Sequence, residues 1–159
     1  MSMQTKWDDR FLEMAELVSR WSKDPSTQCG AVITDSNHRV LGVGYNGFPR
    51  GVEDRPDRLN DRPTKYRMII HAEVNAILNS ISSVVGCTLY VIPLAPCSDC
   101  AKLVIQSGIT RVVCPRMPVG KERWQESVEL TKQMFSEAGV VLDEIDDSEN
   151  NSLPSMRCC

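Results

Sequence analysis

Two short clusters of residues in the sequence have the types and spacing of metal ligands. The first is His71-Ala72-Glu73, and the second is Pro96-Cys97-Ser98-Asp99-Cys100. Each stands at a predicted helix start, and Cys97 and Cys100 project to the same side of a first helical turn. Unpaired N–H groups and partial positive charge at a helix N-terminus favour the thiolate form that a metal needs. We therefore expect His71, Cys97 and Cys100 to bind one metal ion.

Three protein ligands leave the fourth position of a tetrahedral zinc ion open to water, which marks a catalytic zinc site. Zinc lowers the pKa of such a water to about 7, so that hydroxide is available at neutral pH. Glu73 is expected to point at this water and to act as the proton shuttle without ligating the metal. The combination resembles the signature of zinc deaminases, which hydrolyse the exocyclic amine of a nucleobase.

The Cys97–Cys100 spacing has two other interpretations. A structural zinc site also uses this spacing, but a second matching pair of cysteines is missing. A thioredoxin-like redox pair would leave His71 and Glu73 unexplained. The other cysteines within the predicted elements lie in or beside apolar segments, where core packing is expected; they are Cys29, Cys87 and Cys114.

The 159 residues fit one compact deaminase domain over residues 1–142, followed by a polar tail over 143–159. A net charge of −3 argues against a protein that mainly binds long nucleic acid. Apolar runs fall short of the roughly 20 residues that span a bilayer, and the first nine residues lack the apolar stretch of a secretory signal. Seven cysteines, an odd number, do not suit a disulfide framework. We therefore expect a cytoplasmic protein without membrane contact.

Alternating helices and strands predict an α/β fold, with a sheet between two layers of helices. Periodicity and end signals predict helices at Lys6–Ser22, His71–Ser82, Ser98–Ser107 and Glu122–Glu137. Strands are expected at Gly30–Thr34, Arg39–Tyr45, Thr88–Ile92, Arg111–Cys114 and Val140–Leu142. The apolar positions of the second helix that are expected to face inward are Val74, Ala76, Ile77, Leu78 and Ile81.

Residues 46–67 show no helical or strand periodicity and contain several glycines and prolines, so a long loop is expected there. Such a loop in a compact domain is usually functional or disordered. Six Arg and Lys residues against four acidic ones make the segment locally basic. This charge suits contact with a phosphorylated small molecule, although a solvated charged loop is the alternative.

The chain resembles the deoxycytidylate deaminase family from the first helix to about Leu142. Four blocks carry the resemblance: residues 24–31 (Asp-Pro-Ser-Thr-Gln-Cys-Gly-Ala), 44–47 (Gly-Tyr-Asn-Gly), 71–77 (His-Ala-Glu-Val-Asn-Ala-Ile) and 96–102 (Pro-Cys-Ser-Asp-Cys-Ala-Lys). The resemblance implies a cytidine-deaminase-like fold, which is a three-layer α/β/α sandwich with a central mixed five-stranded sheet. It also implies hydrolysis of dCMP to dUMP and ammonia, which feeds thymidylate synthesis. Family members are commonly homohexamers that dCTP activates and dTTP inhibits, with Mg²⁺ accompanying the triphosphate.

The same resemblance assigns further site residues. Asn46 is expected to contact the sugar hydroxyl, Ser26 and Thr27 the substrate phosphate, and Ala72 and Pro96 other parts of the substrate. A simple turn is the alternative for Asn46. The residues expected at a regulatory nucleotide site are Gly44, Tyr45, Asn46, Gly47, Arg50, Lys65 and Tyr66. Trp124, with Arg123, has two interpretations: closing over the substrate, or anchoring the last helix by packing.

The sequence departs from the family pattern at two places. Some members hold a second, structural zinc with extra Cys and His before the catalytic His, but residues 46–70 contain neither residue type. We therefore expect one Zn²⁺ per chain. The family often places an aromatic residue with a basic neighbour after the strand that ends near Cys114, where this chain has Pro115-Arg116-Met117-Pro118. The base-stacking and phosphate contacts are therefore left open.

Three rival functions remain. A tRNA adenosine deaminase shares both zinc clusters, but net negative charge and the block at 44–47 count against binding a folded RNA. A deaminase of free cytidine would not need a phosphate contact. A non-catalytic nucleotide-binding scaffold would have no use for the intact Glu73.

Overall fold

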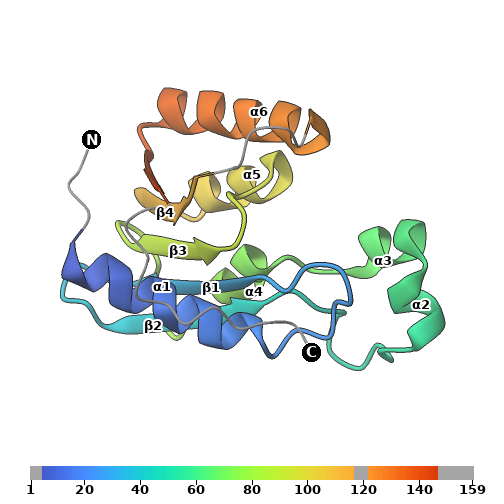
Figure 1. Ribbon diagram of the computed structural model, residues 1–159. Coiled ribbons are helices and arrows are strands. Elements are labelled where there is room, and N and C mark those ends of the chain that lie inside the picture. The colour runs from blue at the N-terminus through green and yellow to red at the C-terminus, as the bar shows by residue number, and fades with distance from the viewer. Residues whose placement is uncertain (1–4, 117–121, 147–159) are drawn as a thin grey trace.

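A mixed five-stranded sheet lies at the centre of the computed structural model, which describes residues 5–116 and 122–146 (Figure 1). The strand order is β2-β1-β3-β4-β5. β1 (Gly30–Thr34) pairs antiparallel with β2 (Val40–Tyr45) and with β3 (Thr88–Ile92). β3 and β4 (Arg111–Pro115) are parallel, as are β4 and β5 (Val141–Ile145). The predicted mixed sheet is therefore confirmed.

Helices cover both faces of the sheet. α1 (Lys6–Ser19) lies on one face, where Phe11 and Ala15 pack against Val32 of β1. α4 (Ala72–Leu78), α5 (Ser98–Gln106) and α6 (Glu122–Ala138) lie on the other face. Ala31 and Ile33 belong to the core on this second face, because successive strand residues point to opposite sides. This arrangement confirms the three-layer α/β/α sandwich.

The segment over 46–67 is more regular than predicted. It contains two short helices, α2 (Pro56–Asn60) and α3 (Arg62–Met68), which lie at one end of the sheet in Figure 1. Proline at the first or second position of each helix does not break it, because the missing N–H has no helical partner there. Asp61 caps α3 by accepting a hydrogen bond from the Thr64 backbone. The prolines therefore mark helix starts, and the prediction of an irregular loop was wrong.

α4 is shorter than predicted, and its apolar stripe is not wholly buried. The chain leaves the helix after Leu78, and the Ile81 backbone N–H donates to the Leu41 carbonyl at 3.0 Å. Leu78 and Ile81 are 69% and 84% exposed, so their expected inward orientation was wrong. The helix packs on the sheet through Ala72 and Ala76 instead.

The last strand continues to Ile145, three residues beyond its predicted end. Asp143 is paired with Val113, and Ile145 is buried in the core beneath α1. Among the described helices, none has the length and apolar character to cross a bilayer.

Candidate active site

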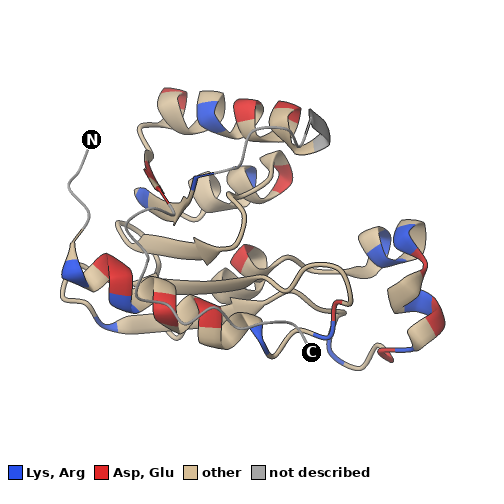
Figure 2. Ribbon diagram, viewed as in Figure 1, with Lys and Arg blue, Asp and Glu red and all other residues tan. Residues whose placement is uncertain are grey.

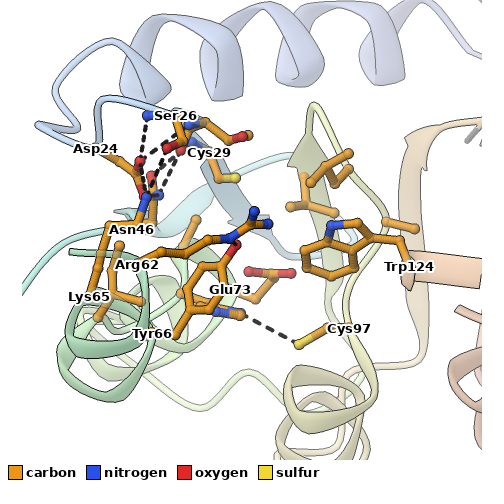
Figure 3. A pocket seen from close by; sticks show the side chains of 17 residues that line it. Asp24, Ser26, Cys29, Asn46, Arg62, Lys65, Tyr66, Glu73, Cys97 and Trp124 are labelled. Atoms are coloured by element: carbon orange, nitrogen blue, oxygen red, sulfur yellow. Dashed lines mark hydrogen bonds and ion pairs between the residues drawn. The ribbon is translucent and has the colours of Figure 1, made fainter. Parts of the chain in front are cut away.

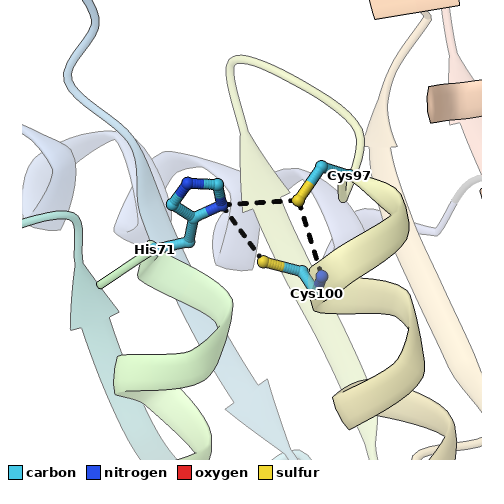
Figure 4. A group of neighbouring side chains, drawn as sticks. All are labelled: His71, Cys97 and Cys100. Carbon is cyan, nitrogen blue, oxygen red and sulfur yellow. Dashed lines mark hydrogen bonds between the residues drawn. The ribbon is translucent and has the colours of Figure 1, made fainter. Parts of the chain in front are cut away.

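The two sequence clusters meet where α4 and α5 begin. His71 is the N-cap residue of α4, Cys97 is the N-cap residue of α5, and Cys100 lies in the first turn of α5. The His71 Nδ1 atom lies 3.2 Å from the Cys100 Sγ atom and 3.5 Å from the Cys97 Sγ atom (Figure 4). All three donor atoms lie within 4.8 Å of one another. The structure therefore brings together the three predicted ligands.

The geometry of these atoms fits zinc. With Zn–S bonds of about 2.3 Å and a Zn–N bond of about 2.0 Å, tetrahedral angles place sulfur and nitrogen ligands about 3.5 Å apart. One imidazole nitrogen and two thiolates are a donor set that zinc prefers. Within the described residues, no other group of His, Cys, Asp and Glu meets the same criterion.

Negative charge is crowded at this site. Hydrogen bonds from Cys100 and His71 lower the pKa of Cys97 to about 4, although burial opposes the change. The pKa of Cys100 is raised, first by its hydrogen bond to Cys97 and then by burial and the charge of Glu73. The hydrogen bond to Cys97 also raises the pKa of His71. A bound cation would relieve this crowding and stabilise both thiolates.

Glu73 lies in the first turn of α4, two residues after the histidine ligand, and is only 5% exposed. Burial raises its pKa above the ordinary value for a glutamate. A raised pKa makes a carboxylate a stronger proton acceptor. Its position supports the role of proton shuttle.

A cavity of about 580 Å³ opens above the metal-ligand cluster (Figure 3). His71, Glu73 and Cys97 line one part of it, and Trp124 of α6 lines the side away from Asp24 and Asn46 in this view. Residues of the segment after α1, of the end of β3 and the loop that follows it, and of α3, where Figure 2 shows Lys and Arg positions, also line the cavity. Ligand pockets of about 300–1,000 Å³ accept small molecules of nucleotide size.

Comparison with known proteins identifies the family. Residues 5–115 match the family described as the cytidine and deoxycytidylate deaminase zinc-binding region. The chain belongs to this family. It is 48% identical over 139 residues to an uncharacterized deaminase in the luxG 3′ region of Aliivibrio fischeri, covering 87% of this chain and 92% of the relative. It is 38% identical over 169 residues to the deoxycytidylate deaminase of Homo sapiens, covering 96% and 92% of the two chains.

Solved structures support the fold. The dCMP deaminase of cyanophage S-TIM5, in complex with dCMP and dUMP, matches with a TM-score of 0.70 and 24% identity, covering 91% of this chain and all of that chain. RibD of Acinetobacter baumannii matches with a TM-score of 0.61 and 21% identity, covering 87% of this chain and 35% of that chain. The cytidine-deaminase-like architecture is thus confirmed. This family catalyses hydrolytic deamination, so the protein is an enzyme of that class.

Most of the expected substrate residues of this deaminase line the cavity. Ser26, Thr27, Asn46 and Ala72 do so. Pro96 is not one of the lining residues, and its carbonyl accepts a hydrogen bond from the Thr131 hydroxyl at 3.0 Å. The expected contact of Pro96 with substrate therefore has no support from the cavity.

Asn46 is tightly bound within the deaminase itself. Its Oδ1 atom accepts from the Cys29 backbone at 2.8 Å, and its Nδ2 atom donates to the Thr27 carbonyl at 2.9 Å. The next residue, Gly47, exchanges two backbone hydrogen bonds with Ile70, directly before the histidine ligand. Asn46 is therefore more than a surface turn residue, because it holds the segment that lines the cavity.

The residues expected at a regulatory site lie in three places. Tyr45, Gly47 and Arg50 line a separate hollow of about 370 Å³, together with Phe48, Pro49, Ile70, Asn75, Leu78 and Asn79. Asn46, Lys65 and Tyr66 line the cavity above the metal-ligand cluster instead. Gly44 packs against α4, where a side chain would collide with the backbone of Ala72 and Ala76.

Sequence reasoning missed how α3 contributes to the cavity. Lys65 is 2% exposed, and its Nζ atom lies 2.8 Å from a carboxylate oxygen of Asp24 and 3.1 Å from the Ser26 hydroxyl. Arg62, on the same helix, also lines the cavity. The available signal was that this basic segment leads directly into His71, so its last turn must return to the metal ligands.

The remaining cysteines follow the prediction with one addition. Cys87 and Cys114 are buried in the core, as expected. Cys29 packs against the same core but also lines the cavity. Burial raises the pKa of Cys29 to about 12, so it remains a neutral thiol at pH 7. Trp124 also lines the cavity, whereas the side chain of Arg123 lies outside the described residues, as do Met117 and Pro118.

Proposed function

We propose that this deaminase hydrolyses dCMP to dUMP and ammonia, and thereby supplies the precursor of thymidylate. The observation that carries the proposal is a nucleotide-sized cavity lined by Glu73 and by His71 and Cys97, two of the three residues of the metal-ligand cluster. The 38% identity to human deoxycytidylate deaminase, over almost the whole chain, supports dCMP as the substrate within this family.

Glu73 performs the proton transfers in this proposal. When bound by His71, Cys97 and Cys100, zinc supplies the Lewis acid that activates water for attack at neutral pH. Glu73 takes a proton from the attacking water and delivers it to N3 of the cytosine ring. It then takes the second proton from the hydroxyl group added at C4 and delivers it to the amine, so that ammonia leaves and the C4 carbonyl forms. Water and dCMP are consumed, and dUMP and ammonia are released.

The substrate is held by the polar segment after α1. Ser26 and Thr27 offer hydroxyl groups to the phosphate, as the family resemblance implies. The same resemblance assigns the sugar hydroxyl to Asn46, which can accept through the second lone pair of its Oδ1 atom, because both of its N–H groups donate within the protein. Both assignments agree with the position of these residues in the lining of the cavity. Ala72, at the start of α4, lies where the backbone can contact the base.

An assay of ammonia release from separate substrates tests the proposed function. The purified protein is incubated with dCMP, deoxycytidine and tRNA, and dUMP is identified by chromatography. We expect rapid release from dCMP only. Equal rates with dCMP and deoxycytidine would indicate a nucleoside deaminase, and release from tRNA alone would indicate an RNA-editing enzyme. Absence of turnover with every substrate, in protein that holds zinc, would favour a scaffold.

We also propose that the hollow lined by Tyr45, Gly47 and Arg50 binds the regulatory nucleotide. It is separate from the catalytic cavity, and Arg50 supplies a cation for a phosphate group. The proposed effectors are dCTP as activator and dTTP as inhibitor, each with Mg²⁺. Rates of dCMP turnover with each effector, with and without Mg²⁺, test this proposal. Rates that neither nucleotide alters would overturn it.

A homohexamer with one zinc ion per chain completes the proposal. Three large apolar side chains, Leu78, Ile81 and Val85, are at least 69% exposed in the single chain, which is typical of a surface that another subunit covers. Sedimentation equilibrium gives the number of chains, and metal analysis gives the zinc content. A monomer would contradict the proposed homohexamer. Two zinc ions per chain would contradict the proposed single zinc site.

A further inference from the structure

Some of the charged side chains that line the catalytic cavity form an ion pair with each other, and one does not. Asp24 and Lys65 form a buried ion pair at 2.8 Å, with side chains 7% and 3% exposed. Glu73 lies beside the metal-ligand cluster. Among the described lining residues outside the metal-ligand cluster, the remaining charged side chain is Arg62. Within the described part of the chain, Arg62 has no carboxylate within 4.0 Å, so its charge is available to an anionic ligand.

Arg62 is held in an orientation that leaves most of its donors open. Its Nε atom donates to the Tyr66 hydroxyl at 2.8 Å, one helical turn along α3. Its guanidinium carbon lies 5.2 Å from the centroid of the Tyr66 ring. Figure 3 shows the guanidinium directed over the cavity. The two terminal nitrogens can therefore form the paired hydrogen bonds with which arginine binds phosphate.

In the segment after α1, the backbone donors of the two residues expected to bind phosphate are already used. The backbone N–H groups of Ser26 and Thr27 both donate to Asp24, at 2.8 and 3.2 Å. The Lys65 ammonium group also donates to that same carboxylate oxygen. The hydroxyl groups of Ser26 and Thr27 remain, but hydroxyls alone do not neutralise a phosphate dianion. A cation from another element is needed.

We propose that Arg62 binds the 5′-phosphate of the substrate and makes this deaminase prefer a nucleoside monophosphate to a nucleoside. Tyr66 is a positioning residue, because it holds the guanidinium through the Nε atom and the ring. The inference rests on the proposed function, since it concerns the phosphate of dCMP. It adds a specificity-determining residue outside the blocks that carry the family resemblance.

The test compares kcat/KM for dCMP and for deoxycytidine in the wild type, Arg62→Gln and Arg67→Gln. Arg67 is the matched control, because it is an exposed arginine of α3 that does not line the cavity. Arg62→Gln is expected to lower kcat/KM for dCMP by about 10- to 100-fold, the range for hydrogen bonds to a charged group. The value for deoxycytidine should change less than about threefold. Tyr66→Phe should also lower the ratio of kcat/KM for dCMP to kcat/KM for deoxycytidine, but by a smaller factor.

Binding of the product gives a second measurement if nucleoside turnover is too slow to detect. Titration calorimetry with dUMP should show a Kd raised by about 10- to 100-fold in Arg62→Gln and unchanged in Arg67→Gln. An unchanged preference for dCMP and an unchanged Kd in Arg62→Gln would overturn the inference and leave the proposed function intact. Equal losses with both substrates would also overturn it. A wild type without preference for dCMP would refute the proposed function, and the inference with it.

Discussion

Asp8 ties the first helix to the sheet, and its ionisation is expected to be worth about 2 kcal/mol of stability. The carboxylate is 1% exposed and accepts hydrogen bonds from Arg111 and from the Tyr90 hydroxyl, each at 2.8 Å. It also accepts from the Thr5 backbone at 2.8 Å, as part of a capping box. Burial raises the pKa of this carboxyl. The hydrogen bonds outweigh burial and lower the pKa from 3.8 to about 2.

The sign of the pH dependence follows from this lowered pKa. Because the folded state favours the charged carboxylate, ionised Asp8 stabilises the fold above pH 3.8, and this contribution is lost as the pH falls through about 2. A pKa difference of about 1.8 corresponds to about 2.4 kcal/mol. About 1 kcal/mol of that should disappear between pH 6 and pH 3, and most of the rest by pH 2.

Urea unfolding of the wild type and Asp8→Asn at fixed pH values from 6 to 3 measures this loss. The difference in the free energy of unfolding between the two proteins is the relevant quantity, because protonation of the metal ligands is common to both. Glu13→Gln, which removes an exposed carboxylate from the same helix, controls for the loss of one negative charge. A difference between wild type and Asp8→Asn that stays constant from pH 6 to pH 3 would refute the reasoning.

Two further predictions concern the wall of the catalytic cavity. Lys65→Met leaves Asp24 buried without its cation, so the free energy of unfolding should fall by about 3–5 kcal/mol in urea titrations; a loss below about 1 kcal/mol would mean that the pair is well solvated. Trp124 lines the cavity, and we expect its aromatic face to pack on the pyrimidine ring. Trp124→Ala should therefore raise KM for dCMP by about tenfold, and Trp124→Phe by much less. Equal KM values in all three proteins would exclude a base contact.

The metal-ligand cluster could be predicted from sequence because its geometry is local. Cys97 and Cys100 share one helical turn, so their spacing alone places both thiols on one side. The position of this turn beside His71 depends on the sheet. The strands β2 and β3, which precede the two helices in the chain, run in the same direction on either side of β1, so both end at the same edge of the sheet. The fold class followed from the same alternation of strands and helices.

The contribution of α3 could not be predicted, because a proline within a polar segment is compatible both with an irregular loop and with the first turn of a helix. Pro56 and Pro63 led us to predict an irregular loop. The positions of Arg62 and Lys65 on a helix that lines the cavity were therefore not predicted. The exposure of one side of α4 was not predicted, for a different reason. Leu78 has the helical spacing of a core residue, and periodicity does not distinguish a face buried within one chain from a face left on its surface.

The most direct test of the account measures zinc content and dCMP turnover together in the wild type and Glu73→Gln. The substitution keeps the shape of the side chain but removes its ability to transfer protons. The account predicts about one zinc ion per chain in both proteins and a kcat about 10²- to 10⁴-fold lower in the variant. Turnover close to the wild-type rate in a zinc-loaded Glu73→Gln protein would contradict it.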